Sequence, residues 1–432
     1  MPYQRALTIV APVRAGARDE LESLLATMGD GVANGSVLDF GKLSGVHFAR
    51  LAVVAEEPNF PAHLILISDF DVSPAKHLGE LAEQEGVDRI FAHCEGYPTS
   101  TGVRDDSDTV SETSLRQVTK VTRLEYLRRH TVKEAATYVN TRGRTLEQIR
   151  QESKLRDAIE DFLDKGDWSG RDPGEVRRAV REHVQADPAL AWALEPAERP
   201  GRFARLREKL HLVLVPLLLL PFVPLLLLAL PFYAVVLRIH ERRDGTPPHV
   251  KQEQSRILEL AALEDHLVHN PFMAVGHVKP GKFRLLTLRA VLVGLNFTTR
   301  HIFNRGNLSG VKTIHFARWV FLDGKRRMFF ASNYDGSMES YMDDFIDKVA
   351  WGLNLVFSNG VGYPKARWLV FGGAKDELAF KDFLRVQQVP TRVWYSAYGN
   401  LTALNIARNE RIRAGLHGEL SRDDERAWVQ SL

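Results

Sequence analysis

The hydrophobic positions of this chain alternate between short apolar runs, typical of strands, and the three-and-four spacing of helices. Leu21, Leu24 and Leu25, for example, share one helical face. In the first part of the chain the pattern predicts a strand at 5–13, a helix at 19–28, strands at 46–54 and 64–68, a helix at 74–85 and a strand at 90–94. This order is that of the ferredoxin-like split βαβ unit.

The second half of the chain repeats parts of the first, which indicates an internal duplication. The matching blocks are VAPVRAG and VGHVKPG at 10–16 and 275–281, HFAR at 47–50 and 315–318, SDFD and SNYD at 68–71 and 332–335, EGYP and VGYP at 95–98 and 361–364, and the ungapped stretches 126–156 and 383–413. The blocks keep the same order and similar spacing in both copies. We therefore predict two copies of one unit.

The second copy shows the same succession of strand and helix patterns. Its predicted elements are 272–278, 283–295, 314–322, 327–332, 339–351 and 353–358, and each copy adds a helix, a strand and a helix at 115–130, 137–140 and 145–163 or at 375–387, 392–397 and 402–414. An open sheet leaves one face to cover, so such units commonly pack face to face. We predict an α+β fold of tandem duplicated ferredoxin-like units packed sheet to sheet. The expected domains are 1–163, 164–270 and 271–432.

The middle domain contains an uncharged apolar segment at 212–237. As a straight helix its 26 residues would run roughly 39 Å, enough to cross a hydrocarbon core of about 30 Å. Prolines interrupt this segment at Pro216, Pro221, Pro224 and Pro231, so a straight helix is not expected. We predict a proline-broken membrane-associated hairpin dipping into one leaflet. The alternatives are a single span and a buried or dimer-forming segment.

Several apolar side chains of this segment are expected to face lipid: Leu212, Leu220, Phe222, Leu228, Phe232 and Leu237. Basic residues flank both ends, which are Arg202, Arg205, Arg207 and Lys209 before it and Arg238, Arg242 and Arg243 after it. Positive flanks stay on the cytoplasmic side, so we expect association with the cytoplasmic face of the inner membrane. A helix is predicted at 252–269, ended by Pro271.

Net charge, cysteine content and the N-terminal sequence limit the classes of function that this chain could have. The net charge of +3 gives no reason to expect a nucleic-acid partner. The single cysteine, Cys94, excludes an internal disulfide and a CxxC metal site, and no other metal motif is present. The N-terminus lacks the continuous apolar run of a signal peptide.

His47 and His315 occupy equivalent positions in the two HFAR blocks. Strand alternation would place His47 on one face with Ala49 and Leu51, opposite Phe48. The pair could act as haem or metal ligands or in acid–base chemistry. It could equally consist of hydrogen-bonded core histidines that both copies inherited.

Arg50 and Arg318 face the other side of the same predicted strands. They are expected to bind an anion or to pair with Asp71 and Asp335 on the next strand. Asp335 precedes Gly336 in a turn-like SNYDGS block, whereas the first copy has Val72 in place of Gly336 and so lacks the Asp-Gly pair. If a catalytic site exists, the second copy is therefore the better candidate, with His315, Arg318 and Asp335 as its residues.

Three further groups are weighed as sites. Asp343, Asp344 and Asp347 have the spacing of a solvated helix face rather than of a metal site. His93 and Cys94 are adjacent, so on the predicted strand they would point to opposite faces, which disfavours a catalytic pair. The aromatic residues Trp394, Tyr395 and Tyr398 would either pack in the core or line a lipophilic pocket.

The blocks TIHFARW, SNYDGS with YMDDFIDK, and VPTRVWYSAY resemble an uncharacterised family of bacterial proteins with this duplicated layout. More distantly, the tandem units resemble the dye-decolorising peroxidase and dimeric α+β barrel superfamily. That resemblance implies a haem whose proximal ligand would be His301 or His315. Ser332 stands where the peroxidase GxxDG motif has its first glycine, so Asp335 and Gly336 match only its DG.

These observations leave three functions open. The first is a membrane-associated protein that binds or processes a membrane lipid or another lipophilic molecule between its two units. The second is a haem-dependent, peroxidase-like oxidoreductase. The third is a non-catalytic scaffold docked to the membrane. Each is compatible with a homo-oligomer, and whether the protein is an enzyme stays open.

Overall fold

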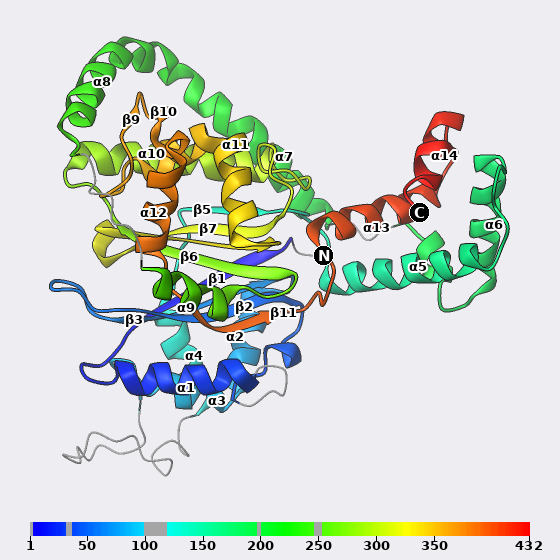
Figure 1. Cartoon of the computed structure of the whole chain (residues 1–432), viewed down its shortest axis with the longest axis horizontal. Coiled ribbons are helices and arrows are strands. Elements are labelled where there is room, and N and C mark those ends of the chain that lie inside the picture. The colour runs from blue at the N-terminus through cyan, green and yellow to red at the C-terminus, as the bar shows by residue number, and fades with distance from the viewer. Residues whose placement is uncertain (1–2, 32–36, 99–118, 197–199, 246–252) are drawn as a thin grey trace.

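The computed structural model describes residues 3–31, 37–98, 119–196, 200–245 and 253–432. Within them the chain is an α+β protein with a five-stranded and a four-stranded antiparallel sheet and a short two-stranded hairpin. In Figure 1 the two sheets form the middle layers, with helices outside them, a helical arch above and a helical arm to one side. The predicted α+β class is confirmed.

The first sheet has the strand order β11-β2-β3-β1-β4. Its strands are β1 (Arg5–Pro12), β2 (Val46–Val54), β3 (His63–Phe70), β4 (Thr131–Val132) and β11 (Thr391–Ser396). The second sheet has the order β5-β7-β8-β6, and its strands are β5 (Ala136–Val139), β6 (His269–His277), β7 (Ile314–Leu322) and β8 (Arg327–Asp335). The small hairpin pairs β9 (Ala366–Arg367) with β10 (Phe371–Gly372).

Each sheet receives one strand from the other half of the chain. β5 follows the first sheet in sequence but pairs with β7, where Tyr138 lies opposite Ala317. β11 follows the second sheet but pairs with β2, where Tyr395 lies opposite Ala49. Separating the halves would therefore strip an edge strand from each sheet, and the predicted domain boundaries do not coincide with the sheets.

Apolar side chains fill the space between the two sheets. This inter-sheet core takes residues from both: Val10, Ala52, Val54, Ile65, Ile67, Met273, Val275, Val320, Leu322, Phe329 and Ala331. Alternating side chains of the same strands point outward to the helices, as period-two alternation requires. The interior between the sheets is thus packed.

Helices cover the outer face of each sheet (Figure 1). Over the first sheet lie α1 (Arg18–Gly31), α2 (Pro74–Glu83), α3 (Gly86–Phe91) and α4 (Lys120–Arg129). Over the second lie α10 (Lys282–His301), α11 (Met338–Phe357) and α12 (Glu377–Gln387), and α9 (Gln254–Glu264) packs near β6 and β11. The helix predicted at 115–130 is α4; residues 115–118 lie outside the described residues.

Three predicted elements are wrong. The strands expected at 90–94 and 353–358 are α3 and the end of α11. Val87, Ile90 and Phe91 share one buried helical face, and a short apolar run does not distinguish strand from helix. The helix expected at 252–269 ends at Glu264, because β6 begins at His269.

A helical arch crosses the outside of α10. It consists of α7 (Arg202–Leu219), a 3-10 turn (Leu220–Phe222) and α8 (Val223–Arg243). Among the described residues this is the one helix long and apolar enough to cross a membrane, and none of its most apolar window is buried in the protein. In Figure 1 it rises at one end of α10 and returns at the other.

The two ends of the arch, at the start of α7 and at the end of α8, are held to the body by polar contacts. They are called the α7 foot and the α8 foot. At the α7 foot, Glu208 accepts hydrogen bonds from Arg300 at 2.7 Å and Arg142 at 3.2 Å. At the α8 foot, Glu241 accepts hydrogen bonds from the backbone amides of Trp368 and Leu369 at 3.0 and 2.9 Å. The predicted hairpin is thus an open arch rather than two antiparallel helices.

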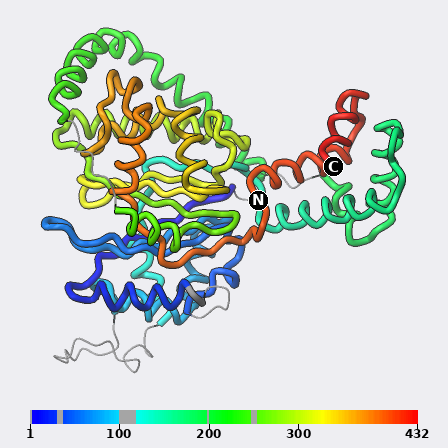
Figure 2. Tube along the Cα trace, in the orientation of Figure 1, coloured from blue at the N-terminus to red at the C-terminus, as the bar shows by residue number. Residues whose placement is uncertain are grey.

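A four-helix arm projects from one side of the body, to the right in Figures 1 and 2. It contains α5 (Leu146–Asp164), α6 (Pro173–Ala186), α13 (Ala403–Gly415) and α14 (Arg422–Val429). Its core includes Ile159, Val180, Ile412 and Trp428. α5 comes from the first half of the chain and α13 from the second, so both halves build the arm.

Acid should destabilise the fold through His77 of α2. The ring is buried, stacks on Phe70 and contacts the Ser68 hydroxyl at 2.7 Å, and burial lowers its pKa to about 4. An unfolded histidine has a pKa near 6.5, so this contribution is complete above about pH 6.5 and is lost as the pH falls toward 4. Between pH 7 and pH 5 we expect a loss of about 2 kcal/mol in the free energy of unfolding.

Denaturant titrations of His77→Gln at both pH values test this. Glutamine keeps a hydrogen-bonding group but does not titrate. Between pH 7 and pH 5, the free energy of unfolding should fall by about 2 kcal/mol less in the variant than in the native protein. Equal losses in the two proteins would contradict the assignment.

Candidate functional site

Two β-bulges place the paired histidines. In β2 the register with β3 shifts between Val46 and Phe48, so His47 is the bulged residue. In β7 the corresponding shift falls on His315. A bulge inserts one extra residue and re-aims the side chains around it.

The bulge overturns the predicted faces of β2. Ala49 and Leu51 point into the core under the helices, but His47 does not share their face. Its ring lies 5.6 Å from that of Phe316, across the space between the sheets. Simple alternation failed because it assumes an unbroken strand.

Each histidine contacts a carboxylate that also caps a helix of the arm. In the second half, His315 Nε2 lies 2.6 Å from Asp335 Oδ1, and Asp335 Oδ2 accepts a hydrogen bond from the Ala403 amide at 2.7 Å, where α13 begins. In the first half, His47 Nε2 lies 3.2 Å from Asp71 Oδ2, which accepts from the first amide of α5. A carboxylate at a helix N-terminus stabilises the helix dipole.

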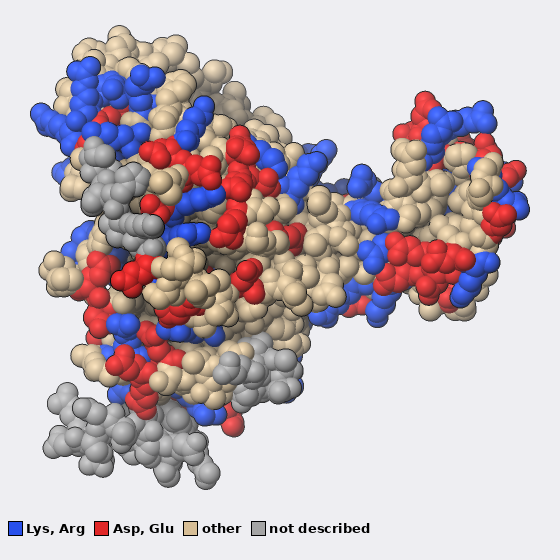
Figure 3. Space-filling model, in the orientation of Figure 1, with Lys and Arg blue, Asp and Glu red and all other residues tan. Residues whose placement is uncertain are grey.

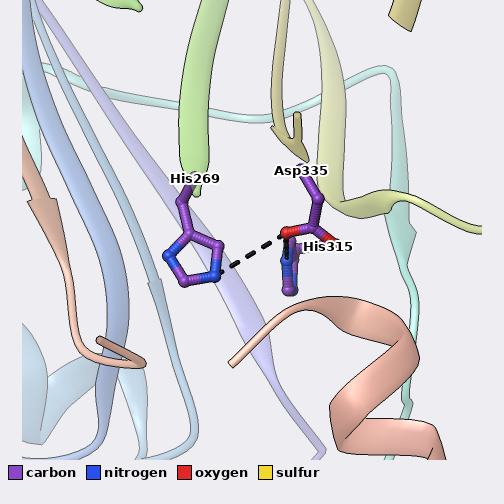
Figure 4. A group of neighbouring side chains, drawn as sticks. All are labelled: His269, His315 and Asp335. Carbon is purple, nitrogen blue, oxygen red and sulfur yellow. Dashed lines mark hydrogen bonds and ion pairs between the residues drawn. The ribbon is translucent and has the colours of Figure 1, made fainter. Parts of the chain in front are cut away.

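The second half adds a third group to this arrangement. His269 is the β6 residue directly opposite Asp335, and its Nε2 lies 3.7 Å from Asp335 Oδ1 (Figure 4). His269, His315 and Asp335 are all buried, and one donor atom of each lies within 4.8 Å of the others. Extending the aligned blocks toward the N-terminus puts Gln4 at the counterpart of His269.

Tyr398 joins the two halves of the site. Its hydroxyl lies 2.5 Å from His47 Nδ1, and its ring lies 5.5 Å from His315. Phe48 packs against both Tyr398 and His315, with ring centroids 5.0 and 5.1 Å away. The predicted aromatic patch is therefore divided: Tyr398 is buried between the halves, and Trp394 stacks on Phe48.

The surroundings of His315 do not fit a haem. Its Nε2 faces Asp335, and the rings of Phe48, His269 and Tyr398 occupy the space around it. The other haem candidate, His301, lies at the end of α10 and contacts His211 of α7 at 2.8 Å. Neither histidine lines one of the larger pockets of the described structure.

Arg50 and Arg318 cross between the sheets in a reciprocal exchange. Arg318 donates to the carbonyl of Leu7 at 2.9 Å and pairs with Asp69 of β3. Arg50 donates to the carbonyl of Phe272 at 2.8 Å and to the side chain of Asn333 of β8. The predicted pairing with Asp71 and Asp335 is wrong, because each arginine reaches the opposite sheet.

In this cluster of two guanidinium groups, Asp69 is the carboxylate that pairs closely with an arginine, and Glu134 lies farther away, 4.0 Å from Arg318. Asp69 and Asn333 occupy matching positions in the SDFD and SNYD blocks, so Arg50 faces an amide where Arg318 faces an acid. Burial and the nearby Arg318 lower the pKa of Arg50 to about 10, and burial raises the pKa of Asp69. Asp69 and the two arginines are almost wholly buried and bond across the two sheets, which indicates a role in joining the sheets.

The remaining predicted groups serve local structure. Asp343 and Asp344 pair with Lys381 and Lys348 on exposed helix faces, as the sequence suggests. Cys94 is buried, which raises the pKa of its thiol to about 12 and makes a thiolate nucleophile unfavourable.

A charged pocket of about 370 Å³ opens between the sheets at the edge closed by β5. Four basic and two acidic residues contribute to its lining, together with Tyr138 and Phe316: Arg5, Lys133, Arg142, Arg300, Asp69 and Glu134. Arg142 and Arg300 also hold Glu208, so this pocket adjoins the α7 foot of the arch. A second, larger pocket of about 660 Å³ lies beside the start of α5 and reaches Asp71.

Sequence reasoning missed His269, Asp69 and the pocket residues. His269 was assigned to the end of a helix, so no strand placed it beside His315. Asp69 differs from Asn333 in otherwise matching blocks, and that difference was the available signal. Arg142 and Arg300 meet through the exchange of β5, which no local pattern reveals.

Comparison of the chain with protein-family models, with curated proteins and with solved structures finds no match. The resemblance to the bacterial family and to the dye-decolorising peroxidase superfamily stays a prediction.

Proposed function

We propose that this protein works at a membrane surface: the arch inserts into one leaflet, and the pocket at its α7 foot binds the headgroup of an anionic lipid. The exposed apolar arch is the observation that carries the proposal. Leu212, Leu220, Phe222, Leu228 and Phe232 are all exposed, as expected of lipid-facing residues, whereas Leu237 is buried at the α8 foot. The cytoplasmic side follows from the basic flanks.

The geometry of the arch favours insertion into one leaflet over a span. From His211 to Leu220 and from Leu220 to Tyr233 the two limbs measure roughly 14 and 20 Å, close to the roughly 15 Å of one leaflet. Both feet contact α10: His211 meets His301 at 2.8 Å, and the hydroxyls of Tyr233 and Thr287 lie 3.3 Å apart. Feet held on one helix cannot lie on opposite sides of a bilayer.

The surface around the arch supports the same orientation. Figure 3 shows the arch without acidic or basic side chains along its outer curve and with basic side chains gathered beside its α8 foot. Those of α8 itself include Arg238, Arg242 and Arg243. Basic residues at the end of an apolar segment suit an anionic lipid surface.

We further propose that the body is a duplicated ferredoxin-like unit. Without the exchanged strands, the first sheet has the order β2-β3-β1-β4, the ferredoxin-like order. In the second sheet, β8 and β6 follow β7 in the same way, and an isolated bridge from Ala274 to Gln388 stands where β4 pairs with β1. In the aligned blocks, Gln388 corresponds to Thr131 of β4.

The pocket favours an amphiphile over a wholly apolar ligand. The inter-sheet core is packed, and the lining of the pocket has two more basic than acidic residues. Its position beside the α7 foot would bring it to the level of lipid headgroups. Arginine binds phosphate through paired, charge-assisted hydrogen bonds.

Co-flotation with vesicles tests the pocket. Arg5→Gln/Lys133→Gln removes two exposed charges from the lining while leaving the Glu208 contacts intact. Phosphate contacts by charged groups contribute about 1.5–3 kcal/mol, so we expect at least a tenfold loss of preference for vesicles containing phosphatidylglycerol over pure phosphatidylcholine. The control, Arg178→Gln/Arg181→Gln on the exposed face of α6, removes the same charge far from the pocket.

The scaffold hypothesis is the second candidate, and the projecting arm is the observation that favours it. If the pocket variant and its control bind both vesicle types equally, the pocket is not a headgroup site. Membrane docking by the arch would then remain, with the arm as the surface presented to the cell.

A further inference from the structure

Three donor atoms in the second half lie within 4.8 Å of one another, and a fourth lies beside one of them. His269 Nε2, His315 Nε2 and Asp335 Oδ1 come from the facing strands β6, β7 and β8. The carbonyl oxygen of Leu401, in the loop before α13, lies 2.9 Å from His269 Nε2. Two imidazoles, one carboxylate and one carbonyl form a donor set that suits a borderline divalent ion such as Zn²⁺.

We propose that His269, His315, Asp335 and the Leu401 carbonyl form a zinc site that fastens the arm to the body. With bonds of about 2.0–2.2 Å, neighbouring donors lie roughly 3.3 Å apart in a tetrahedral site. The distance from His269 Nε2 to Asp335 Oδ1 is 3.7 Å, and the hydrogen-bonded His315 Nε2 and Asp335 Oδ1 need to separate by less than 1 Å from 2.6 Å. Zinc binding thus needs small side-chain adjustments.

The surrounding hydrogen bonds already orient the donors. The Ser396 hydroxyl lies 3.0 Å from His269 Nδ1, leaving Nε2 to face the site. Asp335 Oδ2 accepts from the Ala403 amide, which leaves Oδ1 for the ion. Partners of this kind fix the ring orientation of metal-binding histidines.

The buried carboxylate lacks an ordinary cationic partner. Among the described residues, the ion-pair partners of Asp335 are the two histidines, with no lysine or arginine. A divalent cation would supply the missing positive charge.

The first half of the chain provides an internal comparison. Asp71 contacts His47 and caps α5 there, but Gln4 takes the place of His269 and bonds instead to the Thr141 carbonyl at 2.7 Å. The donor set is therefore complete only in the second half. Since all four donors are protein atoms in a buried site, the ion would be structural.

Titration of the detergent-purified, metal-stripped full-length protein with Co²⁺ tests the proposal, because tetrahedrally bound Co²⁺ absorbs visible light. We expect one equivalent to produce the absorption, Zn²⁺ to abolish it, and either ion to raise the melting temperature. His269→Gln, which copies the first half, should weaken binding at least 100-fold. His47→Gln should bind one equivalent as the native protein does.

The half-buried pair His211 and His301 is the alternative binding site, so His211→Gln/His301→Gln completes the set. Absorption lost in this variant but kept in His269→Gln would overturn the proposal, as would a native protein that gives no stoichiometric signal. Circular dichroism establishes that each variant is folded. If His269→Gln does not fold, the native titration and the two other variants still decide the outcome.

Discussion

Replacing Leu217, Leu220, Phe222 and Leu226 by serine is expected to move the protein from the membrane pellet to the soluble fraction. These side chains near the top of the arch are 56–61% exposed. Burial of one such side chain contributes about 1.5 kcal/mol or more, so four contribute about 6 kcal/mol, or about 10⁴-fold in partition. The feet are unchanged, so the body should stay folded.

A matched variant controls for the loss of exposed apolar surface in general. Val121, Leu258, Leu378 and Leu404 are 53–66% exposed and lie on α4, α9, α12 and α13, away from the arch. Serine at these four positions should leave the protein in the pellet. If the arch variant still pelleted, or became soluble only by changing from dimer to monomer, the arch would be an oligomer contact instead.

The elements of the fold were largely predictable, and the reason is local. Apolar spacing identified most strands and helices, and the aligned blocks indicated the repeated order of elements. Periodicity failed where the run was short, as in α3, and where a bulge interrupted it, as at His47. Both failures arise because neighbouring elements, rather than the run itself, decide the outcome.

The candidate site was less predictable because its parts come from distant segments. Sequence reasoning named His315 and Asp335 and favoured the second copy. It did not place His269 beside them, because that residue belongs to β6 through pairing with Asp335 across the sheet. It paired Arg318 within its own sheet, whereas packing of two sheets brings Arg318 to Asp69.

Arg318→Met should destabilise the protein more than Arg50→Met, although the two arginines occupy matching positions. Removing Arg318 leaves the buried Asp69 without its direct cationic partner, and breaking such a pair costs about 3–5 kcal/mol. Removing Arg50 leaves the neutral Asn333 side chain without a hydrogen-bond donor, but it also relieves the repulsion between the two guanidinium groups. We expect the free energies of unfolding to differ by more than 1 kcal/mol.

Denaturant unfolding of both single variants measures the difference, and Asn333→Asp separates charge from shape. A carboxylate at that position would give Arg50 the partner that Arg318 has, so in an Asn333→Asp background the two methionine substitutions should cost more nearly the same. Equal losses in the native background would mean that packing and the carbonyl contacts, rather than the Asp69 charge, govern the exchange. The difference between Asp69 and Asn333 would then have no electrostatic consequence for stability.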